Sequence, residues 1–203
     1  MRKNDIKRIF SLMIALLILS SCDSMNQIND RGRINIQSLS DIDQAIQDMT
    51  LEEKAGQLIQ AERSSISISD ITKYNIGSIL SGGGSTPNPN TPEAWVSMIN
   101  QMNVAALQSS SGIPIIYGVD AVHGNNNVKN ATIFPHNIGL GAANDPELMK
   151  AIGIATAKEM LAVGVDWNFA PAVSSAQDIR WGRTYESYSE NIQRVASLVV
   201  PYI

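Results

Sequence analysis

The sequence predicts an α/β fold built on a parallel sheet. Three apolar runs that end in glycine, proline or polar residues, 76–80, 113–120 and 165–171, alternate with segments of helical periodicity. Strands that read as continuous apolar runs are typically covered on both faces, which favours a parallel sheet. A (β/α)8 barrel and an open doubly wound sheet both fit this pattern. A barrel takes roughly 250 residues, so about three strands would make an incomplete one.

Capping residues support the prediction of helices in addition to the apolar spacing. Thr50 and Glu53 form a capping-box pattern, Thr91 precedes a proline at a helix start, and Asp145 does the same before Pro146. Helices are therefore expected in four segments: 50–62, 91–105, 144–164 and 189–203.

Composition excludes several classes of function. Hydrophobic residues make up 44% and charged residues 17% of the 203 positions, as is typical of a folded protein. The net charge of −4, without a basic block in the body of the chain, argues against nucleic acid as a partner. Cys22 is the one cysteine, so an intrachain disulfide is excluded. The two histidines lack the spacing of zinc ligands, and no metal site is expected.

The N-terminus has the features of an export signal. Four basic residues precede the apolar stretch 9–19, which is short for a membrane span but suits a signal peptide. The sequence "LSSC" at 19–22 resembles a bacterial lipobox, so residues 1–22 are interpreted as a lipoprotein signal with Cys22 as the lipidated residue. An ordinary signal or anchor helix with an incidental cysteine is the alternative. Residues 23–40 are expected to be a flexible tether. An exported, membrane-anchored lipoprotein, periplasmic or at the cell surface, follows from this interpretation.

Polar residues after the predicted strands are the candidates for chemistry, because ligands of parallel α/β folds bind at the carboxyl ends of strands. Asp120 and His123 follow the second strand. Charged residues are dense after the third strand: Asp178, Arg180, Arg183, Glu186 and Glu190. Singly these are weak signals, since an isolated aspartate can simply cap a turn. Their density indicates partners, which are either one another or a polyhydroxylated ligand.

Two long motifs resemble a known family. "IPIIYGVDAVHGNNNVKNATIFPHNIGL" (113–140) and "FAPAVSSAQDIRWGRTYESYSEN" (169–191) are similar to the N-terminal domain of family 3 glycoside hydrolases, in the β-glucosidase and β-glucan exohydrolase branch. "MTLEEKAGQL" and "IGSILSGGGSTP" match as well. The resemblance implies that residues 41–203 form the N-terminal part of a TIM-type barrel. It also implies hydrolysis of terminal, non-reducing β-D-glucosyl residues with retention of configuration and without a cofactor.

The resemblance assigns roles to individual residues. Asp120 and Arg183 match family positions that hydrogen-bond sugar hydroxyls, and Glu186 is assigned to orient Arg183. Both catalytic groups of the family, the aspartate nucleophile and the glutamate acid/base, fall outside residues 1–203. No catalytic residue is therefore expected within this chain, which is interpreted as an incomplete piece that should be inactive alone. The expected partners are a β-linked glucosyl oligosaccharide and the membrane, through a lipid on Cys22.

Two alternatives remain. The chain could be a non-catalytic, sugar-binding lipoprotein remnant. Within the family, β-xylosidase activity is the other possibility.

Overall fold

The computed structural model describes residues 38–203, so the predicted signal with Cys22, and residues 23–37 of the predicted tether, lie outside it. The first described helix, α2, spans Leu39–Asp48. The Ser38 amide donates to the Asp41 carboxylate over 2.9 Å, which supports this helix start. Residues 39 and 40, which the sequence placed in the tether, are therefore helical. Among residues 38–203, no helix is both long and apolar enough to cross a membrane.

The described residues contain one parallel sheet of four strands. The strands are β1 (Gln60–Glu62), β2 (Ser78–Ser81), β3 (Ile116–Val119) and β4 (Trp167–Asn168). They lie in the order β1-β2-β3-β4, and every neighbouring pair is parallel. A doubly wound sheet reverses its strand order at a switch point, whereas a (β/α)8 barrel keeps strands in sequence order. The predicted fold class is confirmed, with the sequential order of a barrel.

One expected helix is shorter than the sequence suggested, and a strand takes its place. Helix α3 spans Leu51–Gln57, and β1 follows at Gln60–Glu62 where the prediction continued the helix to residue 62. The capping box is present, with Glu53 N donating to Thr50 Oγ1 over 3.2 Å. The helix ends because the chain beyond it pairs with β2: Ser78 N donates to Ile59 O over 3.2 Å. Hydrogen bonding to a neighbouring strand thus overrides local helical periodicity.

Further helices surround these strands. Their bounds are α4 Ile68–Tyr74, α5 Pro92–Leu107, α6 Asn137–Ala143, α7 Pro146–Ala162 and α8 Ile192–Tyr202. Short 3-10 turns cover Arg63–Ser65 and Thr184–Glu186. Helices α5 and α7 begin at the predicted caps, where Thr91 Oγ1 accepts from Ala94 N and Asp145 Oδ1 accepts from Leu148 N.

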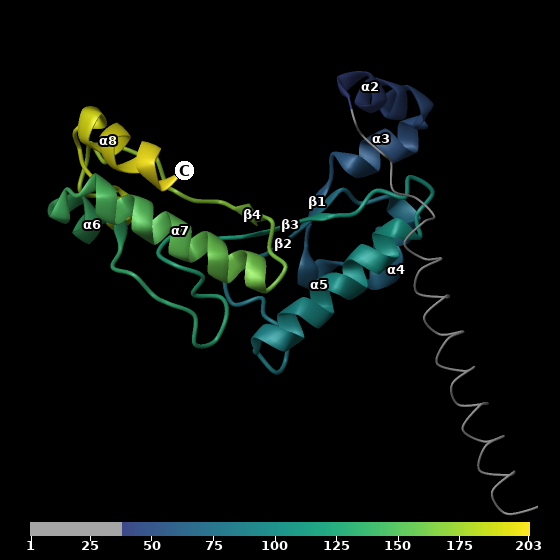
Figure 1. The fold of residues 1–203 in the computed structure, drawn as a ribbon, viewed down its shortest axis with the longest axis horizontal. Helices are drawn as coiled ribbons and strands as arrows, with labels where there is room; N and C mark the ends of the chain where they lie inside the picture. Colours follow the sequence, from purple (N-terminus) through teal and green to yellow (C-terminus); the bar gives the residue numbers. More distant parts are fainter. Residues whose placement is uncertain (1–37) are drawn as a thin grey trace, which may run out of the picture.

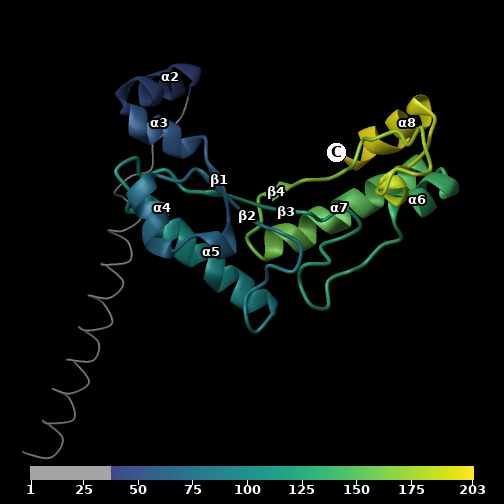
Figure 2. The ribbon, with the colours of Figure 1, turned by 180° about the vertical axis from the view of Figure 1, so that it is seen from behind.

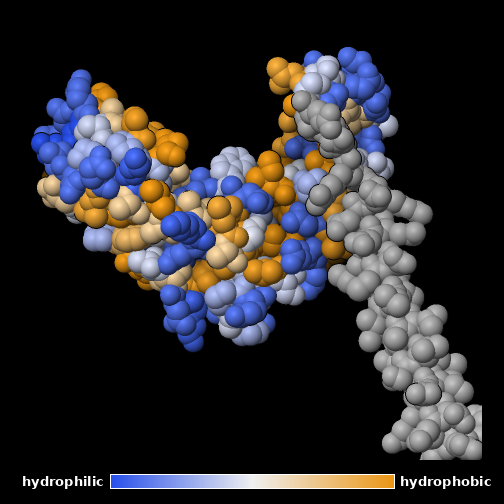
Figure 3. All heavy atoms as spheres, in the orientation of Figure 1, coloured by the Kyte–Doolittle hydropathy of each residue, from blue (hydrophilic) through white to orange (hydrophobic). Residues whose placement is uncertain are grey.

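The helices form two groups with the strands between them (Figure 1). Helices α2 to α5 lie on one side and α6 to α8 on the other, and the view from behind shows the same division (Figure 2). The larger core joins the sheet to α4 and α5, and within it the Tyr117 and Trp95 rings pack at 89° to each other, with 6.3 Å between their centroids. A second core joins α6, α7 and α8 to Tyr188. Figure 3 shows hydrophobic residues over the middle of the molecule, between the two groups.

Candidate sugar-binding site

Asp120 stands directly after β3, at the carboxyl edge of the sheet. The next residue is held by β4: Ala121 N donates to Asn168 Oδ1 over 3.0 Å. Phe169 N donates to Val119 O over 3.0 Å, which extends the pairing of the two strands beyond their ends. The backbone around Asp120 is therefore anchored on both sides by β4.

The Asp120 side chain itself is exposed. Its backbone oxygen accepts a hydrogen bond of 3.1 Å from Asn127 Nδ2. Among the described residues, the carboxylate accepts no hydrogen bond. A rigid backbone thus presents a free carboxylate, which can accept hydrogen bonds from two hydroxyl groups of a ligand.

Arg183 and Glu186 form a two-pronged ion pair. Arg183 Nε donates to Oε1 over 2.8 Å and Nη2 donates to Oε2 over 2.5 Å. The side chains are unequally exposed, 65% for Arg183 and 12% for Glu186. The hydrogen bonds raise the pKa of Arg183 and lower the pKa of Glu186, so both groups stay charged. Glu186 thus contacts Arg183 directly, and its orienting role in sugar binding stays a prediction.

Asp120 and Arg183, predicted to act on one sugar, lie within electrostatic range of each other. The pKa of Arg183 is raised first by Glu186, and the Asp120 carboxylate adds a smaller contribution of the same direction. The guanidinium is therefore hydrogen-bonded to the buried Glu186 and also feels the charge of the exposed Asp120. A carboxylate acceptor and a forked donor in this relation suit adjacent hydroxyls of a sugar ring.

Three aromatic rings link the segments that carry these residues. The His136 ring lies 4.3 Å from the His123 ring and 4.8 Å from the Tyr185 ring, between centroids. Burial, and then the neighbouring His136, lower the pKa of His123. No group of three or more potential metal ligands gathers anywhere in residues 38–203. The ring contacts of the two histidines thus connect the loop after β3 with the 3-10 turn Thr184–Glu186, which follows Arg183 and is called the Arg183 turn below.

The other charged residues of the dense segment are placed differently. Asp178 and Arg180 form their own pair, with Arg180 Nε 3.0 Å from Asp178 Oδ1, and both are exposed. The Glu190 backbone oxygen accepts from Ser175 Oγ over 2.8 Å. Four of the five charged residues of this segment therefore form two local ion pairs, Asp178–Arg180 and Arg183–Glu186.

Two asparagines with a role in this region escaped the sequence analysis. Asn168 anchors Ala121, and Asn137 Nδ2 donates to Glu186 O over 2.7 Å. A polar side chain inside an otherwise apolar strand was an available signal for Asn168. Asn137 carried no such signal, and its partner lies 49 residues away in the sequence.

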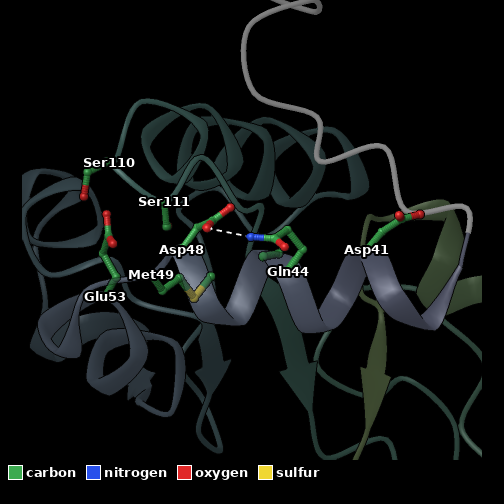
Figure 4. A pocket seen from close by; sticks show the side chains of 8 residues that line it. Asp41, Gln44, Asp48, Met49, Glu53, Ser110 and Ser111 are labelled. Carbon is green, nitrogen blue, oxygen red and sulfur yellow. Dashed lines mark hydrogen bonds between the residues drawn. The ribbon is translucent and has the colours of Figure 1, made fainter.

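A cavity of about 420 Å³ lies elsewhere, between α2, α3 and Ser110–Ser111 (Figure 4). Asp41, Asp48 and Glu53 line it, and Gln44 Nε2 donates to Asp48 over 2.8 Å. Helix α3 precedes β1 and the two serines precede β3, so this cavity faces the amino ends of the strands. Ligands of such sheets gather at the opposite edge, where Asp120 stands.

Comparisons with known proteins agree with this arrangement. The model of the glycosyl hydrolase family 3 N-terminal domain matches residues 50–203. A lysosomal β-glucosidase of Dictyostelium discoideum is 36% identical over 186 residues, which cover 81% of this chain and 22% of that protein. A periplasmic β-glucosidase of Salmonella typhimurium is 32% identical over 146 residues, covering 70% of this chain and 17% of that protein.

Among solved structures, an exo-1,3/1,4-β-glucanase from a Pseudoalteromonas species superimposes with a TM-score of 0.77 and 42% sequence identity. The match covers 86% of this chain and 22% of that one. The chain thus spans about a fifth of the length of these relatives. On the family model, the sequence identities and the shared fold, the chain belongs to glycosyl hydrolase family 3, through its N-terminal domain.

Proposed function

We propose that the chain supplies the sugar-binding part of a retaining β-glucosidase that removes terminal, non-reducing β-D-glucosyl residues from oligosaccharides or glucans. The observation that carries this proposal is the free Asp120 carboxylate in electrostatic range of the Glu186-held Arg183 guanidinium. Relatives named as β-glucosidases and an exo-1,3/1,4-β-glucanase support the substrate class.

In this proposal the two residues fix one glucose ring. Asp120 accepts hydrogen bonds from two hydroxyls, and Arg183 donates to a neighbouring hydroxyl through its remaining N–H groups. Fixing the ring places its anomeric carbon for attack, and positioning of this kind contributes a large share of catalysis. The residues therefore act by holding the substrate.

Retaining hydrolysis needs a nucleophilic carboxylate and a second carboxyl group as acid/base, roughly 5 Å apart. Glu186 is a poor general acid, because Arg183 lowers its pKa whereas a general acid needs a raised pKa. We assign the catalytic pair to sequence outside residues 1–203. The short span of this chain relative to its relatives supports this assignment.

The test compares the 203-residue chain with a longer product that continues its reading frame. We expect the longer product to hydrolyse 4-nitrophenyl β-glucoside and the short chain to bind glucose without turnover. Hydrolysis by the short chain would show that a catalytic pair lies within it. Failure of both activity and glucose binding would remove the β-glucosidase proposal.

We further propose that Cys22 carries a lipid that anchors the protein to a membrane after export. The support is the sequence alone: a basic and apolar leader followed by "LSSC" with the one cysteine of the chain. Labelled palmitate should be incorporated into the wild type and not into Cys22→Ser. Equal labelling of both proteins would contradict the proposal.

A further inference from the structure

Helix α6 begins with a buried asparagine that reaches into the Arg183 turn. Asn137 is 1% exposed, and its Nδ2 donates to the backbone oxygen of Glu186 over 2.7 Å. Its Oδ1 is buried and has no hydrogen-bond partner among the described residues. The Nδ2 donor of the amide is thus paired, whereas burial of the unpaired Oδ1 acceptor is unfavourable.

The same helix contacts the turn a second time, one helical turn later. A Cβ atom placed on Gly141 would lie 1.7 Å from Tyr188 O. Glycine is therefore required where α6 meets the backbone that follows the 3-10 turn Thr184–Glu186. Asn137 and Gly141 together hold the helix and the turn in one fixed relation.

The residue before Asn137 adds a connection to the loop after β3. His136 precedes the first turn of α6, and its ring lies between those of His123 and Tyr185. His123 follows Asp120 by three positions, and Tyr185 follows Arg183 by two. The start of α6 thus contacts both the segment that follows Asp120 and the segment that follows Arg183.

We propose that Asn137 is a positioning residue for sugar binding, which fixes the Glu186 backbone so that its carboxylate holds the Arg183 guanidinium toward Asp120. This inference rests on the proposed function of that site. Glu186 orients Arg183 through two hydrogen bonds, so any displacement of the turn moves the guanidinium. The Arg183 side chain is 65% exposed. Without the bonds to Glu186 it would be mobile, and ordering it on sugar binding would cost conformational entropy.

The residue type supports a role in hydrogen bonding. A position that only filled space would be satisfied by leucine, which has the same branched shape and the same number of side-chain heavy atoms and leaves no buried amide oxygen without a partner. Asparagine here keeps the donor for Glu186 at the cost of an unpartnered Oδ1. The hydrogen bond therefore explains the asparagine, and packing does not.

Hydrogen exchange in the full 203-residue chain tests the restraint without any activity. The Glu186 amide donates to Arg183 O over 2.9 Å and the Ser187 amide donates to Thr184 O over 3.1 Å, so both report on the turn. We expect Asn137→Ala and Asn137→Leu each to speed exchange of these two amides by about tenfold. Asn100→Ala, an exposed asparagine on α5, is the matched control and should leave both rates unchanged. Wild-type rates in Asn137→Leu would mean that the side chain only fills volume and would overturn the proposal.

Glucose titration followed by NMR gives the second readout. We expect Asn137→Leu to weaken glucose affinity about five- to tenfold, and to add no further weakening when Arg183 is already replaced in Arg183→Lys. Additive losses would show that Asn137 acts independently of Arg183 and would reject its positioning role. If the wild-type chain binds no glucose, the proposed function fails for this chain, while the exchange rates still decide whether Asn137 holds the turn.

Discussion

The Arg183 guanidinium donates two parallel hydrogen bonds to the Glu186 carboxylate, of 2.8 Å and 2.5 Å. Of the five N–H donors of an arginine, this arrangement leaves about three for a ligand. The acid is nearly buried and the base is largely exposed. Glu186 therefore holds Arg183 so that the remaining N–H donors of the guanidinium are open to solvent.

The Glu186 pair should make stability depend on pH. Because Arg183 lowers the Glu186 pKa, the ionised carboxylate favours the folded state above the ordinary glutamate pKa of about 4.3. That contribution is lost as the pH falls through the lower pKa of the folded protein. Urea unfolding should show wild type more stable than Glu186→Gln at neutral pH, with the difference shrinking in acid. Glu190→Gln, an exposed control, should show little difference, and a pH-independent gap for Glu186→Gln would contradict the prediction.

Asp120→Ala should abolish much of the sugar affinity without harming the fold. The side chain is exposed and accepts no hydrogen bond from the described residues, so the free energy of unfolding should change by less than about 0.5 kcal/mol. Loss of charged hydrogen bonds to a sugar should reduce glucose affinity, or kcat/KM of the longer enzyme, by about 10- to 100-fold. Full affinity in a stable variant would remove Asp120 from the site.

Two glycines of one helix should respond in opposite directions to alanine. A Cβ on Gly141 would meet Tyr188 O at 1.7 Å, whereas a Cβ on Gly139 would meet Pro135 Cβ at an ordinary 3.6 Å. Gly141→Ala should cost about 3 kcal/mol of unfolding free energy. Gly139→Ala should gain about 0.5 to 1 kcal/mol from helix propensity. Denaturant melts compare the two directly, and similar values would mean that α6 does not dock closely on the Arg183 turn.

Tyr117→Phe should lower the free energy of unfolding, because it breaks a buried hydrogen bond between two hydroxyl groups. The Tyr117 hydroxyl lies 2.7 Å from Ser81 Oγ, and both residues are buried. Removing one hydroxyl leaves the other without a partner, at a cost of about 1 to 2 kcal/mol. Adding Ser81→Ala should cost little more or recover part of the loss, because neither polar group then remains. Tyr74→Phe, at an exposed tyrosine, is the control, and an equal loss there would contradict a specific contribution from the buried hydroxyl pair.

Features that depend on neighbours in sequence could be predicted from the chain itself. Thr50 with Glu53, Thr91 and Asp145 cap helices through bonds that span two or three residues. The apolar runs indicated the α/β class, and the motifs around Asp120 and Arg183 indicated the family. The Arg183–Glu186 pair also spans only three residues, so its formation is local.

The tertiary structure decided what depends on distant partners. β1 exists because Gln60–Glu62 pairs with β2, while the same residues alone continue a helical pattern. Asn168 and Asn137 matter only because folding brings them to Ala121 and Glu186, 47 and 49 residues away in sequence. A side-chain amide can hydrogen-bond with many kinds of partner. The amino-acid sequence does not say which of them folding will bring within hydrogen-bond distance. The sequence by itself therefore determined which residues are candidates for binding a ligand, and the packing of α6 and β4 decided how they are held.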